Sequence, residues 1–309
     1  MKRLIIVFTV LIVLLSLAAS LAGALSYGHD RYRTVTTARV ETVAVQDAGV
    51  YRYSLRTLVT EGTPWDFVRL FVGIPVLVAS FVIYLRGSLR GSVVFIGSLA
   101  SFLYQYLLWT FDWAYNAYFL VYVGAFALSL CTLGLVFAGM DLSRVRTEIS
   151  ERFPVVTATI FSFGVGGLLL FKCLGEIIPS IGTGAMPANS AGYYTMVDQA
   201  LDLGLLVPLY ILVGILLLKR DTLGYLLSAS TLILAMTVGL SVVAGELMLG
   251  LSTGRVNIAG IAVFSFFLIA ALWLLIKVLA SMRSTGSLKA GYLQIINTSA
   301  RIHASPRRL

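Results

Sequence analysis

The sequence predicts an all-α integral membrane protein, a bundle of about eight transmembrane helices. Hydrophobic residues make up 59% of the 309 residues and charged residues only 12%, whereas about a quarter of a soluble domain is charged. The mean hydropathy is +0.93. Apolar runs of about 20 residues, the length that crosses a bilayer core, recur along almost the whole chain. Together these observations exclude a soluble enzyme or binding module.

The apolar runs divide the chain into eight spans. They cover residues 4–25, 67–86, 92–111, 116–139, 154–177, 198–218, 222–248 and 258–280. The first could be a signal peptide, because Ala22-Gly23-Ala24 resembles a cleavage site, but its apolar stretch is longer than usual and we expect a retained helix. The predicted organisation is a first transmembrane helix (1–25), an extracytoplasmic β-rich segment (26–66), a seven-helix bundle (67–280) and a basic cytoplasmic tail (281–309).

The formal charge of +9 follows from the distribution of bases between the loops. Lys and Arg gather before the first span, in the loops 86–91, 140–153 and 219–221, and after the last span, whereas the short alternate connections carry at most one base. The positive-inside rule therefore places both termini in the cytoplasm of a plasma (inner) membrane. Because topology explains the basic charge, nucleic acid is not expected as a partner, and the lipid bilayer is.

The segment 26–66 is the only sizeable polar piece on the outer side. Residues 32–37 and 40–46 are rich in β-branched residues, Asp47-Ala48-Gly49 supplies turn residues, and Val50–Tyr53 alternates again. We expect a hairpin or a three-stranded sheet, followed by a short helical stretch to Glu61. So small a segment needs support from other surfaces. It should dock on the helix ends or recruit a protein partner.

Several chemistries lack their residues in this sequence. Both histidines, His29 and His303, lie outside the spans, so haem held between helices is not expected. Lys277 lies at the inner end of the last span, where a snorkelling side chain is favoured over a Schiff base such as retinal requires. The cysteines, Cys131 and Cys173, lie at different depths and cannot pair. No cofactor is predicted, the identity of any metal stays open, and a role other than an enzyme is favoured.

Ionisable groups inside spans are costly and mark function by default. Here they gather in the outer part of the bundle, and the inner part is nearly free of charge. We therefore predict an acidic crater, open to the outside and covered by residues 26–66, that binds a small cationic ligand or ion. Its candidate residues are Asp66, Arg69, Gln105, Asn116, Lys172, Glu176, Asp202 and Glu246, with Asp198 one turn before Asp202. Glu176 and Glu246 are the strongest of these.

A purely structural explanation competes with this site. Charges near the interface can snorkel, and Lys172 could pair with Glu176 or Glu246. Trp109, Trp113, Tyr115 and Tyr118 match an aromatic belt at the membrane surface. No internal repeat is strong enough in the sequence to predict a transporter of repeated halves.

Four motifs, taken in order, resemble a family of uncharacterised bacterial or archaeal multi-pass membrane proteins. They are residues 50–53 (VYRY), 87–91 (GSLRG), 115–123 (YNAYFLVYV) and 201–208 (LDLGLLVP), so the resemblance covers residues 40–245. It implies a prokaryotic plasma-membrane protein and carries no activity or residue role with it.

Three functional hypotheses remain open. The first is binding or transport of a small cation at the acidic crater. The second is an accessory or scaffold subunit that recruits a protein partner through residues 26–66 and the helix faces. The third is a membrane enzyme that uses carboxylates or a metal at the outer face.

Overall fold

The computed structural model describes residues 1–27, 31–183, 186–187, 192, 195–253 and 256–282, and within them it confirms a helical bundle with eight candidate spans. Six spans are single helices, and in one of them, α10, the span ends at Leu251. The other two are each built from three consecutive helices. The single helices are α1 (Lys2–Leu25), α4 (Leu89–Phe111), α5 (Phe119–Ala138), α7 (Val155–Ile181), α10 (Thr222–Thr253) and α11 (Ile258–Ser281). The basic tail predicted after the last span lies outside the described residues beyond Met282.

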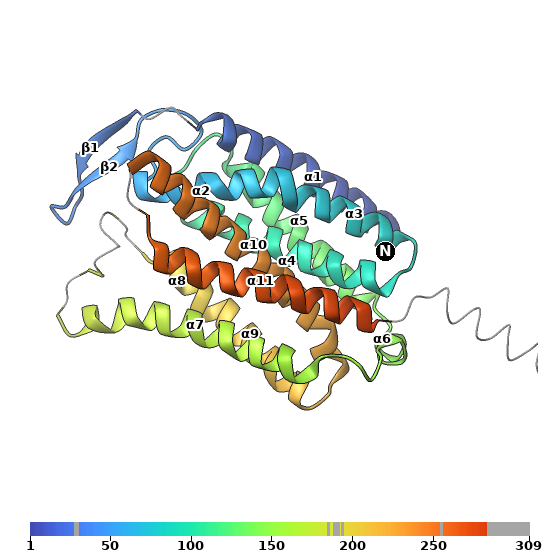
Figure 1. Ribbon diagram of the computed structural model, residues 1–309. Coiled ribbons are helices and arrows are strands. Elements are labelled where there is room, and N and C mark those ends of the chain that lie inside the picture. The colour runs from blue at the N-terminus through green and yellow to red at the C-terminus, as the bar shows by residue number, and fades with distance from the viewer. Residues whose placement is uncertain (28–30, 184–185, 188–191, 193–194, 254–255, 283–309) are drawn as a thin grey trace, which may run out of the picture.

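The helices lie side by side with the β-hairpin at one end of the bundle and residue 1 at the other (Figure 1). We call these the hairpin end and the N-terminal end. Of the residues in its apolar window, α4 has 72% buried, against 17–39% for the other spans. It packs against α3, α5 and α10. α4 is therefore the centre of the bundle, and the apolar faces that the other helices expose suit contact with lipid.

The second span is longer than the sequence indicates. It consists of α2 (Arg56–Val68), η1 (Arg69–Gly73) and α3 (Ile74–Leu85) and begins at Arg56, not near residue 67. Hydropathy does not reveal α2 as part of the span, because its polar residues face protein instead of lipid. Thr63 and Asp66, for example, are buried. Asp66 and Arg69 therefore lie about 15 and 20 Å from the start of the span. They do not open it, as the sequence suggests.

The hairpin consists of β1 (Tyr32–Thr36) and β2 (Thr42–Gln46), antiparallel with Tyr32 opposite Gln46 and Thr36 opposite Thr42. The possible third strand does not form. After β2, only Leu55 pairs with the hairpin, through a single bridge to Val45. The chain folds back because the backbone N–H of Tyr53 donates to Gln46 O at 2.8 Å and that of Gln46 donates to Ser54 O at 2.9 Å. This turn directs Tyr51 into the bundle, where it is 1% exposed.

The sixth span repeats the architecture of the second. It consists of α8 (Val197–Leu201), η2 (Asp202–Leu206) and α9 (Val207–Leu218), so that each span contains a five-residue π-helix followed by a twelve-residue α-helix. Each then turns through a residue with positive φ, Gly87 (φ 78°) or Arg220 (φ 53°). The same number of residues separates all corresponding positions in the two spans. The second and sixth spans thus repeat one helical architecture that their residue types conceal.

The two π-helices have a common cause in proline. Pro75 and Pro208 stand at the second position of α3 and α9, six residues after the first residue of each π-helix. Proline has no N–H to give to the carbonyl four residues earlier, so a regular helix cannot continue through it. A π-turn, in which Ile74 N–H reaches Arg69 O and Val207 N–H reaches Asp202 O, absorbs the irregularity.

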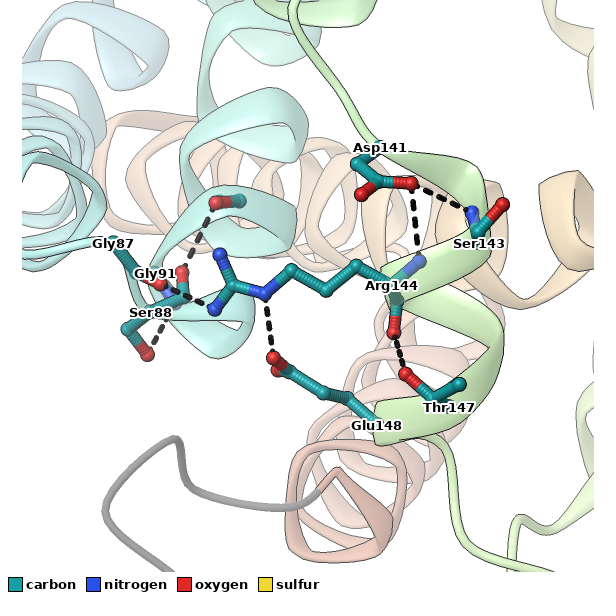
Figure 2. Close-up of polar contacts among 9 residues, drawn as sticks. Gly87, Ser88, Gly91, Asp141, Ser143, Arg144, Thr147 and Glu148 are labelled. Atoms are coloured by element: carbon teal, nitrogen blue, oxygen red, sulfur yellow. Dashed lines mark hydrogen bonds and ion pairs between the residues drawn. The ribbon is translucent and has the colours of Figure 1, made fainter. Parts of the chain in front are cut away.

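At the N-terminal end, the short helix α6 (Leu142–Glu148) lies between α5 and α7 and binds the turn between α3 and α4. Asp141 caps α6 by accepting hydrogen bonds from the backbone of Ser143 and Arg144. Figure 2 shows that Arg144 pairs with Glu148 of the same helix (Nε to Oε1, 2.6 Å). It also donates to the carbonyl of Gly87, in the turn after α3 (2.8 Å). Charged groups at this end therefore hold loops in place.

Candidate functional site

Asp202 is a buried carboxylate on η2, 6% exposed. Its Oδ1 accepts a hydrogen bond of 2.6 Å from the Tyr104 hydroxyl of α4, and the thiol of Cys173 on α7 lies 3.9 Å from Oδ2. By the helical rise it lies about 8 Å inside the hairpin end of its span. Asp202 thus joins the sixth span to the central helix α4.

Around Asp202 lie the groups predicted on the fifth and sixth spans. Lys172, Glu176 and Asp198 all interact electrostatically with the Asp202 carboxylate. Glu176 accepts a hydrogen bond of 3.0 Å from the amide of Gln199. Lys172 is exposed. Among the described residues it forms no ion pair, so the possible pairing with Glu176 or Glu246 is not found there.

Two further carboxylates approach from α2 and from the end of α4. Glu61 on α2 interacts electrostatically with Asp198, and Asp112, which follows α4, interacts with both. Burial, with smaller contributions from the charges of Asp198 and Glu61, raises the pKa of Asp112 from 3.8 to about 7. We call Glu61, Asp112, Glu176, Asp198 and Asp202 the acidic cluster. Sequence reasoning did not include Asp112 or Glu61 among the site residues.

Glu246 lies at the margin of the acidic cluster. Its side chain is half-buried, interacts electrostatically with Glu61 and accepts a hydrogen bond of 3.3 Å from Asn257, an exposed residue that caps α11. The structure therefore places Glu246 nearer the surface than Asp202.

Arg69 and Gln105 form a separate polar group in the middle of the bundle. Arg69 is 0% exposed and begins η1. Its Nε donates to Gln105 Oε1 at 2.6 Å, its terminal nitrogens donate to the hydroxyl and carbonyl of Ser101 at 3.3 and 3.0 Å, and its guanidinium lies 4.0 Å from the ring centre of Phe102. All these partners belong to α4. Arg69 thus occupies in the second span the place that Asp202 occupies in the sixth.

Asp66, one turn before Arg69, is 1% exposed and binds the outer segment. Its Oδ2 accepts a hydrogen bond from the hydroxyl of Tyr51, which in turn accepts one of 3.1 Å from Trp109 Nε1. Burial, followed by the nearby Asp66 charge, raises the pKa of Tyr51 well above its ordinary value of 10.0, so Tyr51 remains a neutral donor. The residues predicted as one crater thus lie in two groups, one around Asp202 and one around Asp66 and Arg69.

Trp109 and Trp113 are part of the protein interior, not of a belt facing lipid. They are 3% and 7% exposed, their rings stack 5.0 Å apart, and Trp113 packs 4.0 Å from the ring of Tyr51. Tyr115 is 79% exposed and does fit a surface position. Tyr51 and Trp109 escaped the sequence prediction because nothing in the sequence shows that residues 50–53 fold back into the helices.

Asn116 has a local structural role beside an open pocket. Its side chain accepts a hydrogen bond from the backbone of Tyr118 (2.8 Å) and donates one to the carbonyl of Ala114 (3.2 Å), which shapes the turn before α5. The pocket has a volume of about 440 Å³. It lies where the end of α1, the outer segment and this turn meet, and Ala22, Ser26, Val50, Tyr53, Asn116 and Tyr118 are among the residues that line it.

Among the described residues, no group of three or more His, Cys, Asp or Glu side chains is arranged to hold a metal ion. Comparison of the chain with protein-family models, with curated proteins and with solved structures found no match.

Proposed function

We propose that this protein binds, and carries within the membrane, a small cation that enters the acidic cluster from outside the cell. The observation that carries this proposal is Asp202, a buried carboxylate on an irregular turn inside a membrane-spanning segment whose architecture recurs in the second span. Ionisable residues at such places are costly and mark substrate or ion pathways. In transporters of repeated halves, binding sites occur where irregular helices from the halves meet.

The charges around Asp202 favour a cation as the ligand. The acidic cluster contains five carboxylates, and Lys172 is the base that interacts with Asp202, Asp198 and Glu61. A surplus of negative charge in a partly desolvated place attracts and retains positive ions. The hydroxyl of Tyr104 fixes one oxygen of Asp202, which leaves the other, beside Cys173, to face a ligand.

We further propose that the hairpin end faces the outside of a plasma membrane and that both termini face the cytoplasm. The positively charged loops support this orientation, because Arg86, Arg90, Arg144 and Lys219 all lie at the opposite end. The resemblance to an uncharacterised prokaryotic family supports the location and adds no activity.

Thermal unfolding of the full-length protein in mild detergent tests the cation site. Sodium, calcium and methylammonium chlorides are compared with N-methylglucamine chloride at equal ionic strength. We expect at least one cation to raise the melting temperature of the wild type and to lose this effect in Asp202→Asn. Asp141→Asn, at the N-terminal end, is the matched control and should respond as the wild type does. No response to any cation, or an equal response in Asp202→Asn, would refute the proposal.

A second function, recruitment of a protein partner, is favoured by the hairpin. Four of the five residues of β1 are exposed, and the hairpin projects beyond the helices (Figure 1). In a sheet of two strands each strand keeps one free edge, which can pair with a strand of another chain. A chain purified without residues 32–46 should then lose a co-purifying protein that the intact chain retains.

A further inference from the structure

A set of buried hydroxyl groups surrounds Asp66. Ser16 and Ser20 on α1, Tyr106 on α4 and Tyr122 on α5 are at most 1% exposed. The interactions of the serine hydroxyls lie within this set: Ser16 and Ser20 with Tyr106, and Ser20 also with Asp66. The amide nitrogen of Gln105 has no hydrogen-bond partner among the described residues. Hydroxyls that interact chiefly with one another and with one carboxylate, inside membrane-spanning helices, are suited to pass a proton.

These hydroxyls are next to one another and next to Asp66. Ser16 and Ser20 lie beside the hydroxyl of Tyr106, which also interacts electrostatically with Asp66 and Arg69. The rings of Tyr106 and Tyr122 stack 6.4 Å apart at 20°. Tyr122 in turn interacts with Asp66. The hydroxyls thus form a continuous group around one carboxylate.

Asp66 has no cation in contact with it. Arg69 follows one turn later, but its guanidinium is bound to Gln105 and Ser101 of α4, and the described residues show no ion pair that includes Asp66. The carboxylate also interacts with the hydroxyls of Tyr51 and Ser20, which are neutral donors. Burial of an ionised carboxylate without a paired charge is unfavourable, and a proton is the smallest species that can neutralise it.

The hydroxyl group reaches the surface at the open pocket. Asn116 and Tyr118 line that pocket, the side chain of Tyr122 interacts with Asn116, and the backbone N–H of Tyr122 bonds to the carbonyl of Tyr118 at 3.0 Å. From the pocket, polar groups therefore follow one another through Tyr122 and Tyr106 to Asp66. Chains of hydroxyls and carboxylates of this kind form proton relays in membrane proteins.

We propose that Asp66 is a proton-binding site inside the membrane and that Tyr122 and Tyr106, assisted by Ser16 and Ser20, conduct the proton to it from the pocket at the hairpin end. A hydronium ion in the pocket gives up the proton and becomes water, each hydroxyl accepts one proton and releases another, and a new O–H bond converts the Asp66 carboxylate to a carboxylic acid. The reaction needs no other reactant. This site is independent of the cation site at Asp202.

The groups that face Asp66 define what else can titrate with it. They are Tyr51 from the outer segment, Arg69 from its own span, Tyr106 from α4 and Tyr122 from α5, while α1 contributes the two serines. α10 also packs on α2, but its one carboxylate, Glu246, lies near Glu61 instead.

Infrared difference spectroscopy of the full-length protein in phosphatidylcholine vesicles, titrated with acid and base, tests the proton site. We expect the pH-dependent carbonyl band of protonated carboxylic acids to contain a component that is lost in Asp66→Asn and kept in Asp112→Asn and Asp202→Asn. Absence of such a component at every pH, or an unchanged band in Asp66→Asn, would overturn the proposal. If Asp66→Asn does not fold, Tyr51→Phe replaces it: loss of the donor to Oδ2 should shift the band to higher frequency, and an unshifted band would refute the assignment.

The conducting path is tested separately by hydrogen–deuterium exchange of the same band. Tyr122→Phe removes a hydroxyl whose side-chain partner, Asn116, keeps its hydrogen bonds to Ala114 and Tyr118, so the variant should fold while the exchange of the Asp66 proton slows several-fold. Tyr27→Phe, on an exposed ring that does not line the pocket, is the matched control and should exchange at the wild-type rate. Equal rates in the Tyr122→Phe variant and the wild type would show that the proton does not travel through Tyr122.

Discussion

At the residue scale, Asp112 should make the stability of the protein depend on pH. Its pKa in the folded state is about 7, above the ordinary 3.8, so the folded state holds this proton more tightly than the unfolded state. The free energy of unfolding therefore falls as the pH rises from about 4 to about 7. In Asp112→Asn this loss disappears, and we expect the variant to exceed the wild type in melting temperature at about pH 8 and to match it near pH 4.

Thermal unfolding in detergent across this pH range provides the measurement. Glu61→Gln is an informative companion, because the charge of Glu61 contributes to the raised pKa of Asp112. In that variant the pH at which stability falls should move downward. A difference between Asp112→Asn and the wild type that is the same at every pH would contradict this explanation.

The sequence placed some of the candidate residues in the right neighbourhood but did not group all of them as the structure does. Asp202, Lys172 and Glu176 are close enough to interact, as their positions near the outer ends of neighbouring spans indicated. Asp66 and Arg69 were placed at a span opening because the polar residues of α2 hid that helix from a hydropathy pattern. Their partners Tyr51, Ser101 and Trp109 come from distant parts of the chain, and spacing within one sequence does not reveal such contacts.

At the element scale, the repeated turns after α3 and α9 depend on glycines in equivalent places. A Cβ at Gly91 would lie 2.7 Å from the backbone carbon of Ile83, and one at Gly224 would lie 2.8 Å from that of Leu216. Backbone cannot move aside as a flexible side chain can, so each helix hairpin would have to open. We expect Gly91→Ala and Gly224→Ala each to lower the free energy of unfolding by about 1–3 kcal/mol.

Gly134→Ala is the control for these two substitutions. Gly134 is exposed within α5 and has nothing within 4 Å of the place a Cβ would take. Since alanine favours helix over glycine, this variant should be as stable as the wild type or slightly more so, as chemical or thermal denaturation can show. Equal effects in all three variants would mean that helix propensity, and not the close approach, determines the outcome.

Span boundaries were predicted to within a few residues except at the start of the second span and the end of the fifth, and the larger miss is at α2, whose polar residues face protein. The fourth and eighth spans begin and end within a few residues of the expected positions because lipid-facing helices are apolar along their length. The repeat of π-helices was missed because its members share geometry and not residue type: Arg69 in one span corresponds to Asp202 in the other. Only the prolines that follow each π-helix were a visible signal.

At the scale of the whole molecule, the opposite charges of the two ends should decide how the protein lies in the membrane. The hairpin end holds the acidic cluster, and the N-terminal end holds the basic loops around α3, α6 and α9. Translocation of bases is disfavoured during insertion, so the N-terminal end should stay in the cytoplasm. Val40, in the hairpin turn, is 83% exposed, and Lys219, in the turn after α9, is also exposed.

Cysteine labelling at these two residues tests the orientation. In spheroplasts we expect an impermeant maleimide to react with Val40→Cys, and with Lys219→Cys only after the membrane is opened. The unsubstituted chain is the control, because Cys131 and Cys173 lie within spans where such a reagent does not reach. Reaction of Lys219→Cys alone in sealed spheroplasts would reverse the orientation. It would then place both the acidic cluster and the path to Asp66 on the cytoplasmic side.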